Sequence, residues 1–115
     1  MHELGLCRSI LAIVLNKLAT CRRVVVKSIC VEIGSLVAVE KMALLFNFAV
    51  VIKGTVAEQA TLNIIDVPAR GQCNECSQIV ALRKRFEFCR YCNYSLLTVI
   101  AGDEFCVKEI EVEYV

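Results

Sequence analysis

Residues 73–92 read CNECSQIVALRKRFEFCRYC, and the cysteines at the two ends of this stretch carry the clearest chemistry in the chain. They form two Cys-x-x-Cys pairs with 12 residues between them. A tight turn within each pair can present two thiolates to one ion, and the gap is long enough for a hairpin to join the pairs. Four thiolates with no open position are typical of a closed structural zinc site. The predicted Zn(II) ligands are Cys73, Cys76, Cys89 and Cys92.

Disulfide bonds are the alternative, because this short chain holds an even number of cysteines, eight. Disulfides need an oxidising compartment, and we find no convincing export signal. The apolar run from Ser9 to Leu15 mimics the middle of a signal peptide, but Asn16-Lys17 interrupts it. We therefore favour a metal site and expect a cytoplasmic protein. The remaining cysteines are interpreted as small buried side chains: Cys7, Cys21, Cys30 and Cys106.

The composition indicates one apolar domain with a small insert. Of the 115 residues, 57% are hydrophobic and 22% are charged, so nearly every regular element should have a buried face. The longest apolar run, Met42 to Ile52, is shorter than the about 20 residues that cross a membrane. Membrane insertion is therefore not expected, whereas a homodimer formed through an exposed apolar surface stays open as an alternative.

The charge balance argues against nucleic-acid binding. The net charge is +1, and no basic stripe is broad enough to follow a phosphate backbone. Two local basic clusters, Arg83-Lys84-Arg85 and Arg22-Arg23, are interpreted as solvated edges. Contact with an acidic partner is the alternative for both clusters.

The hydrophobic pattern predicts an α+β fold, with two helices on a small mixed sheet of about three strands and an inserted zinc-ribbon-like module. In the first strand, Val25, Ile29, Val31 and Ile33 should share the buried side, and in the last, Ile110, Val112 and Tyr114 should face away from three glutamates. The predicted helices are 2–19 and 39–53, and the predicted strands are 22–34, 61–67 and a last one after Gly102-Asp103.

The cysteine module should depend on its metal. We place it at residues 68–102, inserted into an α+β domain of residues 1–67 plus 103–115. A segment of this size is too small to fold by burial alone, whereas structural zinc contributes on the order of 10 kcal/mol or more in finger peptides. Ser77 and Asn93 follow the two pairs at positions where a left-handed turn is common, a conformation that Asn93 tolerates better than Ser77 does.

The amino terminus, Met1-His2-Glu3, is a second candidate metal site and holds the only histidine in the chain. A histidine at position two can offer its imidazole, its own amide nitrogen and the terminal amine to one ion. Square-planar nitrogen coordination suits nickel(II) or copper(II) better than zinc. A large second residue generally prevents removal of the first methionine, so the amine should belong to Met1. Chemistry alone also allows a simple solvated histidine here.

Motifs along essentially the whole chain, in order, resemble those of one family. They are Met-His-Glu-Leu at 1–4, residues 31–36 followed by Val39-Glu40, Phe-Asn-Phe at 46–48, residues 53–58, the two cysteine pairs and residues 108–112. On these motifs the chain is similar to the HypA/HybF family of nickel metallochaperones for hydrogenase maturation. Some members carry a histidine just after a cysteine pair, where this chain has Ser77 and Asn93. A pH-driven exchange of zinc ligands is therefore not expected.

The resemblance implies a nickel metallochaperone and not an enzyme. Ni(II) would be transient cargo, bound by the Met1 amine and the His2 side chain with backbone amides of His2 and Glu3, while Zn(II) would be structural. Glu40 is a candidate for a further nickel ligand or for a contact to the ligands, or it is simply an anion in the first turn of the second helix. The domain 1–67 plus 103–115 would bind nickel, and the module 68–102 would bind zinc.

The resemblance also implies partners. They are a nickel-handling GTPase of the maturation pathway and the precursor of the hydrogenase large subunit, with neither nucleic acid nor membrane. The alternative function is a zinc-ribbon protein-interaction module without a nickel role.

Overall fold

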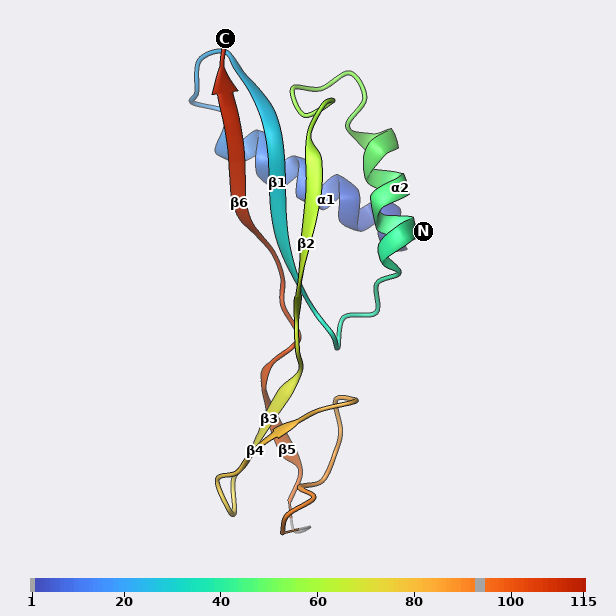
Figure 1. Ribbon diagram of the computed structural model, residues 1–115, viewed down its shortest axis with the longest axis vertical. Helices are drawn as coiled ribbons and strands as arrows, with labels where there is room; N and C mark the ends of the chain where they lie inside the picture. The colour runs from blue at the N-terminus through green and yellow to red at the C-terminus, as the bar shows by residue number, and fades with distance from the viewer. Residues whose placement is uncertain (1, 93–94) are drawn as a thin grey trace. The chain divides into compact units, whose positions relative to one another are not determined.

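The computed structural model describes residues 2–92 and 95–115, which form two compact units (Figure 1). The first unit comprises residues 2–31, 39–64 and 107–115, and the second comprises residues 32–38 and 65–106. Because the chain passes between the units four times, neither unit is one continuous stretch of sequence.

The secondary structure confirms the predicted α+β fold. Two three-stranded sheets form, with strand orders β2-β1-β6 and β4-β3-β5. The helices and strands are α1 (His2–Lys17), β1 (Val24–Gly34), α2 (Lys41–Val51), β2 (Thr61–Val67), β3 (Arg70–Cys73), β4 (Ile79–Ala81), β5 (Leu97–Ala101) and β6 (Phe105–Tyr114).

The core of the first unit lies between α1, α2 and one face of the sheet, and α1 runs across that face (Figure 1). The side chain of Cys7 is fully buried, and its thiol donates a hydrogen bond to the carbonyl of Leu44 at 3.2 Å. Burial raises the pKa of Cys7 to about 11, so it stays a thiol. The prediction of a small buried side chain is confirmed for Cys7, whereas Cys21 and Cys30 are half-buried and Cys106 is exposed.

Two details of strand alternation differ from the prediction. In β1 the buried side chains are first Val24 and Val26 and then every second residue from Ile29 to Ile33. The alternation therefore changes phase between Val26 and Ile29. Val25, expected on the buried side, is therefore only half-buried. A one-residue change of phase moves every later side chain to the opposite face. In β6, Tyr114 is 70% exposed because it lies at the end of the last strand, although Ile110 and Val112 are half-buried as expected.

The second unit has a small core, which is built around the sheet β4-β3-β5. Two glycines allow close backbone approach here: a Cβ at Gly34 would lie 2.0 Å from the carbonyl carbon of Gly102, which itself has φ +105°. Any larger residue at Gly34 would force the backbone apart. The buried hydrophobic residues of this core are Ala69, Cys73, Val80, Leu82, Cys89 and Leu97.

Candidate metal centres

The four cysteines of the two pairs lie together in the second unit, with their sulfur atoms all within 4.8 Å of one another. The Sγ–Sγ distances are 3.6 Å for Cys73–Cys92 and 3.6 Å for Cys76–Cys89. Four sulfurs at about 2.3 Å from one tetrahedral ion would be about 3.8 Å apart, so the cluster has the size of a zinc–thiolate site. A disulfide needs sulfurs about 2.05 Å apart, and none of the eight cysteines is in a disulfide.

Local backbone structure places the first pair. Cys73 ends β3, and the turn that follows returns the amide of Cys76 to within 3.4 Å of the Cys73 sulfur. The amide of Ser77 donates to the Cys73 carbonyl at 2.9 Å. Ser77 has φ +65°, which is the left-handed conformation expected at this position. The corresponding residue of the second pair, Asn93, lies outside the described residues.

The strained turn at Ser77 gives a testable prediction. A residue with a side chain destabilises the folded state by about 1–2 kcal/mol in the left-handed region. Glycine avoids that penalty, but it lowers the free energy of unfolding by about 0.4–1 kcal/mol because it gives the unfolded chain more conformational freedom. Ser77→Gly should therefore raise the free energy of unfolding by about 0.5–1 kcal/mol. Denaturant titration of the zinc-loaded protein measures this, with Ser9→Gly in α1 as a control that should be destabilising. Equal or lower stability of Ser77→Gly would contradict the strain.

Hydrogen bonds within the cluster favour thiolates at two of its positions. The Ser95 hydroxyl, 3.3 Å from the Cys73 sulfur, and then the Cys76 amide lower the pKa of Cys73 to about 6. At Cys89, the hydrogen bond from the Cys92 amide lowers the pKa most. Desolvation raises the pKa and the Tyr91 amide lowers it, and the resulting pKa lies below its usual value. The Ser95 hydroxyl and backbone amides thus prepare the cluster to hold a cation.

The position of Cys76 shows why a cation is needed. The Gln78 amide lowers its pKa, but desolvation and the sulfur atoms of Cys73, Cys89 and Cys92 outweigh that amide and raise the pKa to about 12. Four negative sulfurs this close repel one another, so they can all ionise only around a positive ion. The donor set therefore fits a divalent metal, and four soft thiolates suit zinc.

At the amino terminus of the first unit, α1 begins at His2. The imidazole of His2 is exposed, and its Nδ1 lies 3.7 Å from an oxygen of the Glu3 carboxylate. The same oxygen accepts a hydrogen bond from the Glu40 amide at 3.1 Å. This amide and then the amide of Glu3 itself lower the pKa of the Glu3 carboxyl, which therefore stays ionised beside His2. Met1, the predicted source of the terminal amine, lies outside the described residues.

Glu40 is the N-cap of α2. Its carboxylate accepts a hydrogen bond from the Ala43 amide at 2.6 Å, and its backbone is extended, with φ −89° and ψ 111°. Its contact with the amino-terminal motif is made by its backbone amide, through Glu3. The sequence pattern did not reveal this link, because the two glutamates are 37 positions apart.

Two substitutions separate the capping role of Glu40 from a nickel role. Glu40→Ala should lower the free energy of unfolding by about 0.5–2 kcal/mol, because it removes the cap. Glu40→Ser restores a capping oxygen and should recover most of that stability. Thermal denaturation of both variants checks this, and nickel titration of the stable Glu40→Ser variant then asks whether the carboxylate contributes to metal affinity. Equal stability of the alanine and serine variants would contradict the capping role.

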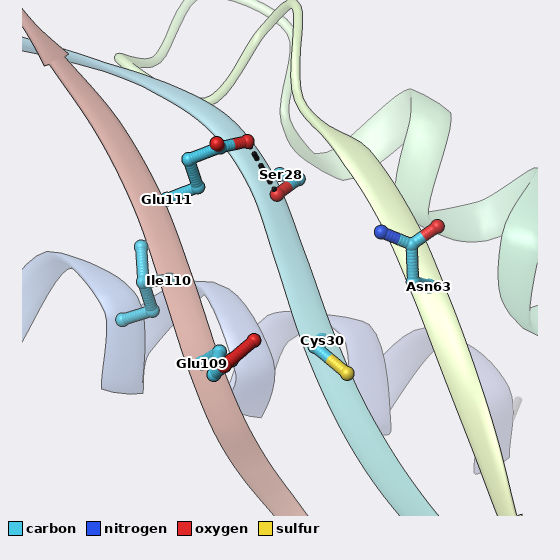
Figure 2. A pocket seen from close by; sticks show the side chains of 6 residues that line it. All are labelled: Ser28, Cys30, Asn63, Glu109, Ile110 and Glu111. Carbon is cyan, nitrogen blue, oxygen red and sulfur yellow. Dashed lines mark hydrogen bonds between the residues drawn. The ribbon is translucent and has the colours of Figure 1, made fainter.

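A third polar region is a hollow of about 500 Å³ on the sheet of the first unit. Figure 2 shows Cys30 on the central strand, between Asn63 of β2 and Glu109 of β6. The Ser28 hydroxyl donates to the Glu111 carboxylate at 3.1 Å. Among residues 2–92 and 95–115, however, the four cysteines are the one group of three or more histidine, cysteine or acidic side chains placed to hold a metal. The hollow is therefore not a metal site of that kind.

Neither helix in the described part of the chain is long and apolar enough to cross a membrane.

Comparisons with known proteins agree over nearly the full chain. A family model described as "Hydrogenase/urease nickel incorporation, metallochaperone, hypA" matches residues 1–112. Proteins named hydrogenase maturation factor HypA from Legionella pneumophila (strain Corby) and Acidithiobacillus ferrooxidans (strain ATCC 53993 / BNL-5-31) are each 42% identical over 113 residues, which is 98% of this chain and 100% of each relative.

Solved structures share the fold. The solution structure of the nickel metallochaperone HypA from Helicobacter pylori has a TM-score of 0.70 at 19% identity and covers 98% of both chains. A second solution structure of a HypA protein has a TM-score of 0.72 at 22% identity, covering 98% of this chain and 97% of the other. At these identities the likeness shows the common architecture.

Proposed function

Because this chain belongs to the HypA family of hydrogenase nickel-incorporation metallochaperones, we propose that it binds one nickel(II) ion at its amino terminus and delivers it to the precursor of a nickel–iron hydrogenase. The proposed ligands are the Met1 amine, the His2 imidazole and the backbone amides of His2 and Glu3. The observation that carries the proposal is an exposed His2 at the first turn of α1, beside a carboxylate.

The start of a helix is suited to such a site. The first four amides of an α-helix have no backbone partner within the helix, so helix formation does not use those of His2 and Glu3, although the Glu3 amide contacts its own carboxylate. The ionised Glu3 carboxylate lies against the imidazole and can orient it or offset the charge of a bound cation. Glu40 contributes indirectly by holding Glu3 through its amide.

The exposure of this site favours transfer over storage. His2 is 55% exposed, so a partner can approach the ion and replace ligands one at a time. Nitrogen ligands of this kind bind copper(II) more strongly than nickel(II), so selectivity must come from metal availability and from partner docking. The amine and the imidazole must lose protons to bind, so nickel affinity should fall as pH falls.

The two domains predicted from the sequence would then divide the work. We propose that Cys73, Cys76, Cys89 and Cys92 hold zinc permanently in the module of residues 68–102, while the domain of residues 1–67 plus 103–115 carries the nickel. Zinc would supply shape there, because a closed four-thiolate site has no position open for a substrate. The proposed partners are a nickel-handling GTPase and the hydrogenase large-subunit precursor, and the proposed compartment is the cytoplasm.

A complementation experiment tests the function. A hydrogenase-producing host that lacks its own family member is given this chain or its His2→Ala variant at matched protein levels. We expect hydrogenase activity and hydrogenase-bound nickel to return with the unaltered chain and to stay near background with the variant. Full activity with His2→Ala would instead favour a zinc-ribbon interaction module without a nickel role.

A further inference from the structure

The segment between β4 and β5 carries basic and aromatic side chains that the proposed nickel transfer does not use. We refer to residues 83–91 as the basic–aromatic loop. Its three aromatic side chains, Phe86, Phe88 and Tyr91, are 79%, 60% and 67% exposed. Single exposed apolar side chains are common, but a group of them within one short segment is typical of an interaction surface. The basic side chains of the loop are also exposed: Arg83, Lys84, Arg85 and Arg90.

The loop is held in shape by its one acidic residue, Glu87, which is only 9% exposed. One carboxylate oxygen accepts from the amides of Arg83 at 2.6 Å and Lys84 at 3.1 Å. The other lies 3.6 Å from Nη2 of Arg83 and 3.9 Å from Nη2 of Arg90. Arg90 also donates to the carbonyl of Ala81 at 3.0 Å. A surface ordered before binding loses less conformational entropy when a partner docks.

An apolar pair lies within the same segment. Phe88 and Leu96 face each other in an isolated antiparallel bridge, and Leu96 is 47% exposed. Side chains directly opposite one another in an antiparallel pair project from the same face. The segment therefore offers apolar area together with cations.

The charge of the loop contrasts with that of the remaining chain. It holds four of the 13 basic residues and one of the 12 acidic residues, a net charge of +3. The rest of the chain has nine basic and eleven acidic residues, a net charge of −2. Because Glu87 is buried within the loop, the exposed charged side chains of the loop are all cations.

We propose that the basic–aromatic loop docks an acidic segment of a partner protein in which apolar side chains alternate with Asp and Glu. The guanidinium group of arginine can bind a carboxylate through two parallel hydrogen bonds, and exposed aromatic rings supply the apolar contact. A long nucleic acid fits less well, because it needs a longer basic surface than this loop provides and the rest of the chain has a net negative charge. The inference does not depend on nickel binding.

The test uses the full, zinc-loaded chain and a fluorescein-labelled peptide of repeated Glu-Glu-Phe units, with fluorescence anisotropy as the readout. We expect binding that weakens as salt is raised, because exposed charge pairs are screened. Lys84→Glu/Arg85→Glu should weaken binding about tenfold or more, since each exposed charge pair contributes modestly and both are reversed. Phe88→Ser should weaken binding while leaving the salt dependence unchanged.

Arg22→Glu/Arg23→Glu is the matched control. It makes the same change of net charge at exposed residues of the first unit, and it should leave peptide affinity unchanged, as should His2→Ala. Zinc content equal to that of the unaltered chain verifies the fold of each variant. The proposal would be overturned if the peptide did not bind or if both double variants weakened binding equally. Tighter binding of an oligothymidine than of the peptide would also overturn it, in favour of nucleic acid.

Discussion

Chelation of the zinc that we propose at the four cysteines is expected to unfold the second unit and to leave the helices of the first folded. Among the described residues, the core cluster of the second unit comprises only six buried hydrophobic side chains, and two of these are Cys73 and Cys89 themselves. Burial on this scale does not offset the entropy of ordering the module. Structural zinc contributes on the order of 10 kcal/mol or more, so losing it should abolish the folded module outright.

The same effect should follow from Cys73→Ser, with Cys106→Ser as the matched control at an exposed thiol of the same unit. Metal analysis and amide hydrogen exchange measure the outcome. For Cys73→Ser we expect zinc to be lost and the amides of β3, β4 and β5 to exchange fast, while those of α1 and α2 stay protected. Acid should act in the same direction, because protons compete with the ion for the four thiolates as pH falls. Retained protection of β3 to β5 in zinc-free protein would contradict a metal-dependent module.

Residues added ahead of Met1 should remove tight nickel binding while zinc stays bound. A Gly-Ser extension converts the terminal amine into an amide and moves it away from His2, so the proposed chelate cannot close. Loss of groups that merely orient metal ligands costs about 10–100-fold in affinity, and loss of a direct ligand should cost at least as much. His2→Ala should have a similar effect.

Equilibrium dialysis of freshly purified, untagged protein gives the measurement, with nickel and zinc determined in the same samples. The control carries the same Gly-Ser residues after Val115, where they are expected to change neither metal. A pH series should show nickel affinity falling in acid for the unaltered chain. Unchanged nickel uptake by the extended protein would remove Met1 from the ligand set, and unchanged uptake by His2→Ala would remove the imidazole.

The regular elements could be predicted because their signals are local. Helical spacing of apolar residues located α1 and α2, although α1 ends at Lys17, two residues before the predicted end. The valine- and isoleucine-rich run located β1, but its change of phase after Val26 depends on what packs against the strand, which periodicity cannot report. The two cysteine pairs are a sequence signal of the same local kind, and the structure brings all four sulfurs together.

What sequence reasoning missed is long-range polar contact. Ser95 approaches the Cys73 sulfur from 22 residues away, and the Glu3–Glu40 link spans 37. No pattern marks either partner, because serine and glutamate are ordinary surface residues. For Glu40 the sequence suggests a nickel ligand, a contact to the ligands or an anion in the first turn of a helix. Its capping role was missed because Ser, Thr, Asp and Asn are the usual N-caps. Which atoms hold nickel stays a prediction from chemistry and family resemblance.

The strand order β2-β1-β6 has a consequence for synthesis. β6 is an edge partner of β1, and the amide of Val115 donates to the carbonyl of Arg23 at 3.0 Å, so β1 pairs with a strand that is synthesised much later. Until β6 has left the ribosome, that edge of β1 is bare and can pair with another nascent chain. Prematurely terminated polypeptides should consequently aggregate or be degraded before they can acquire cargo.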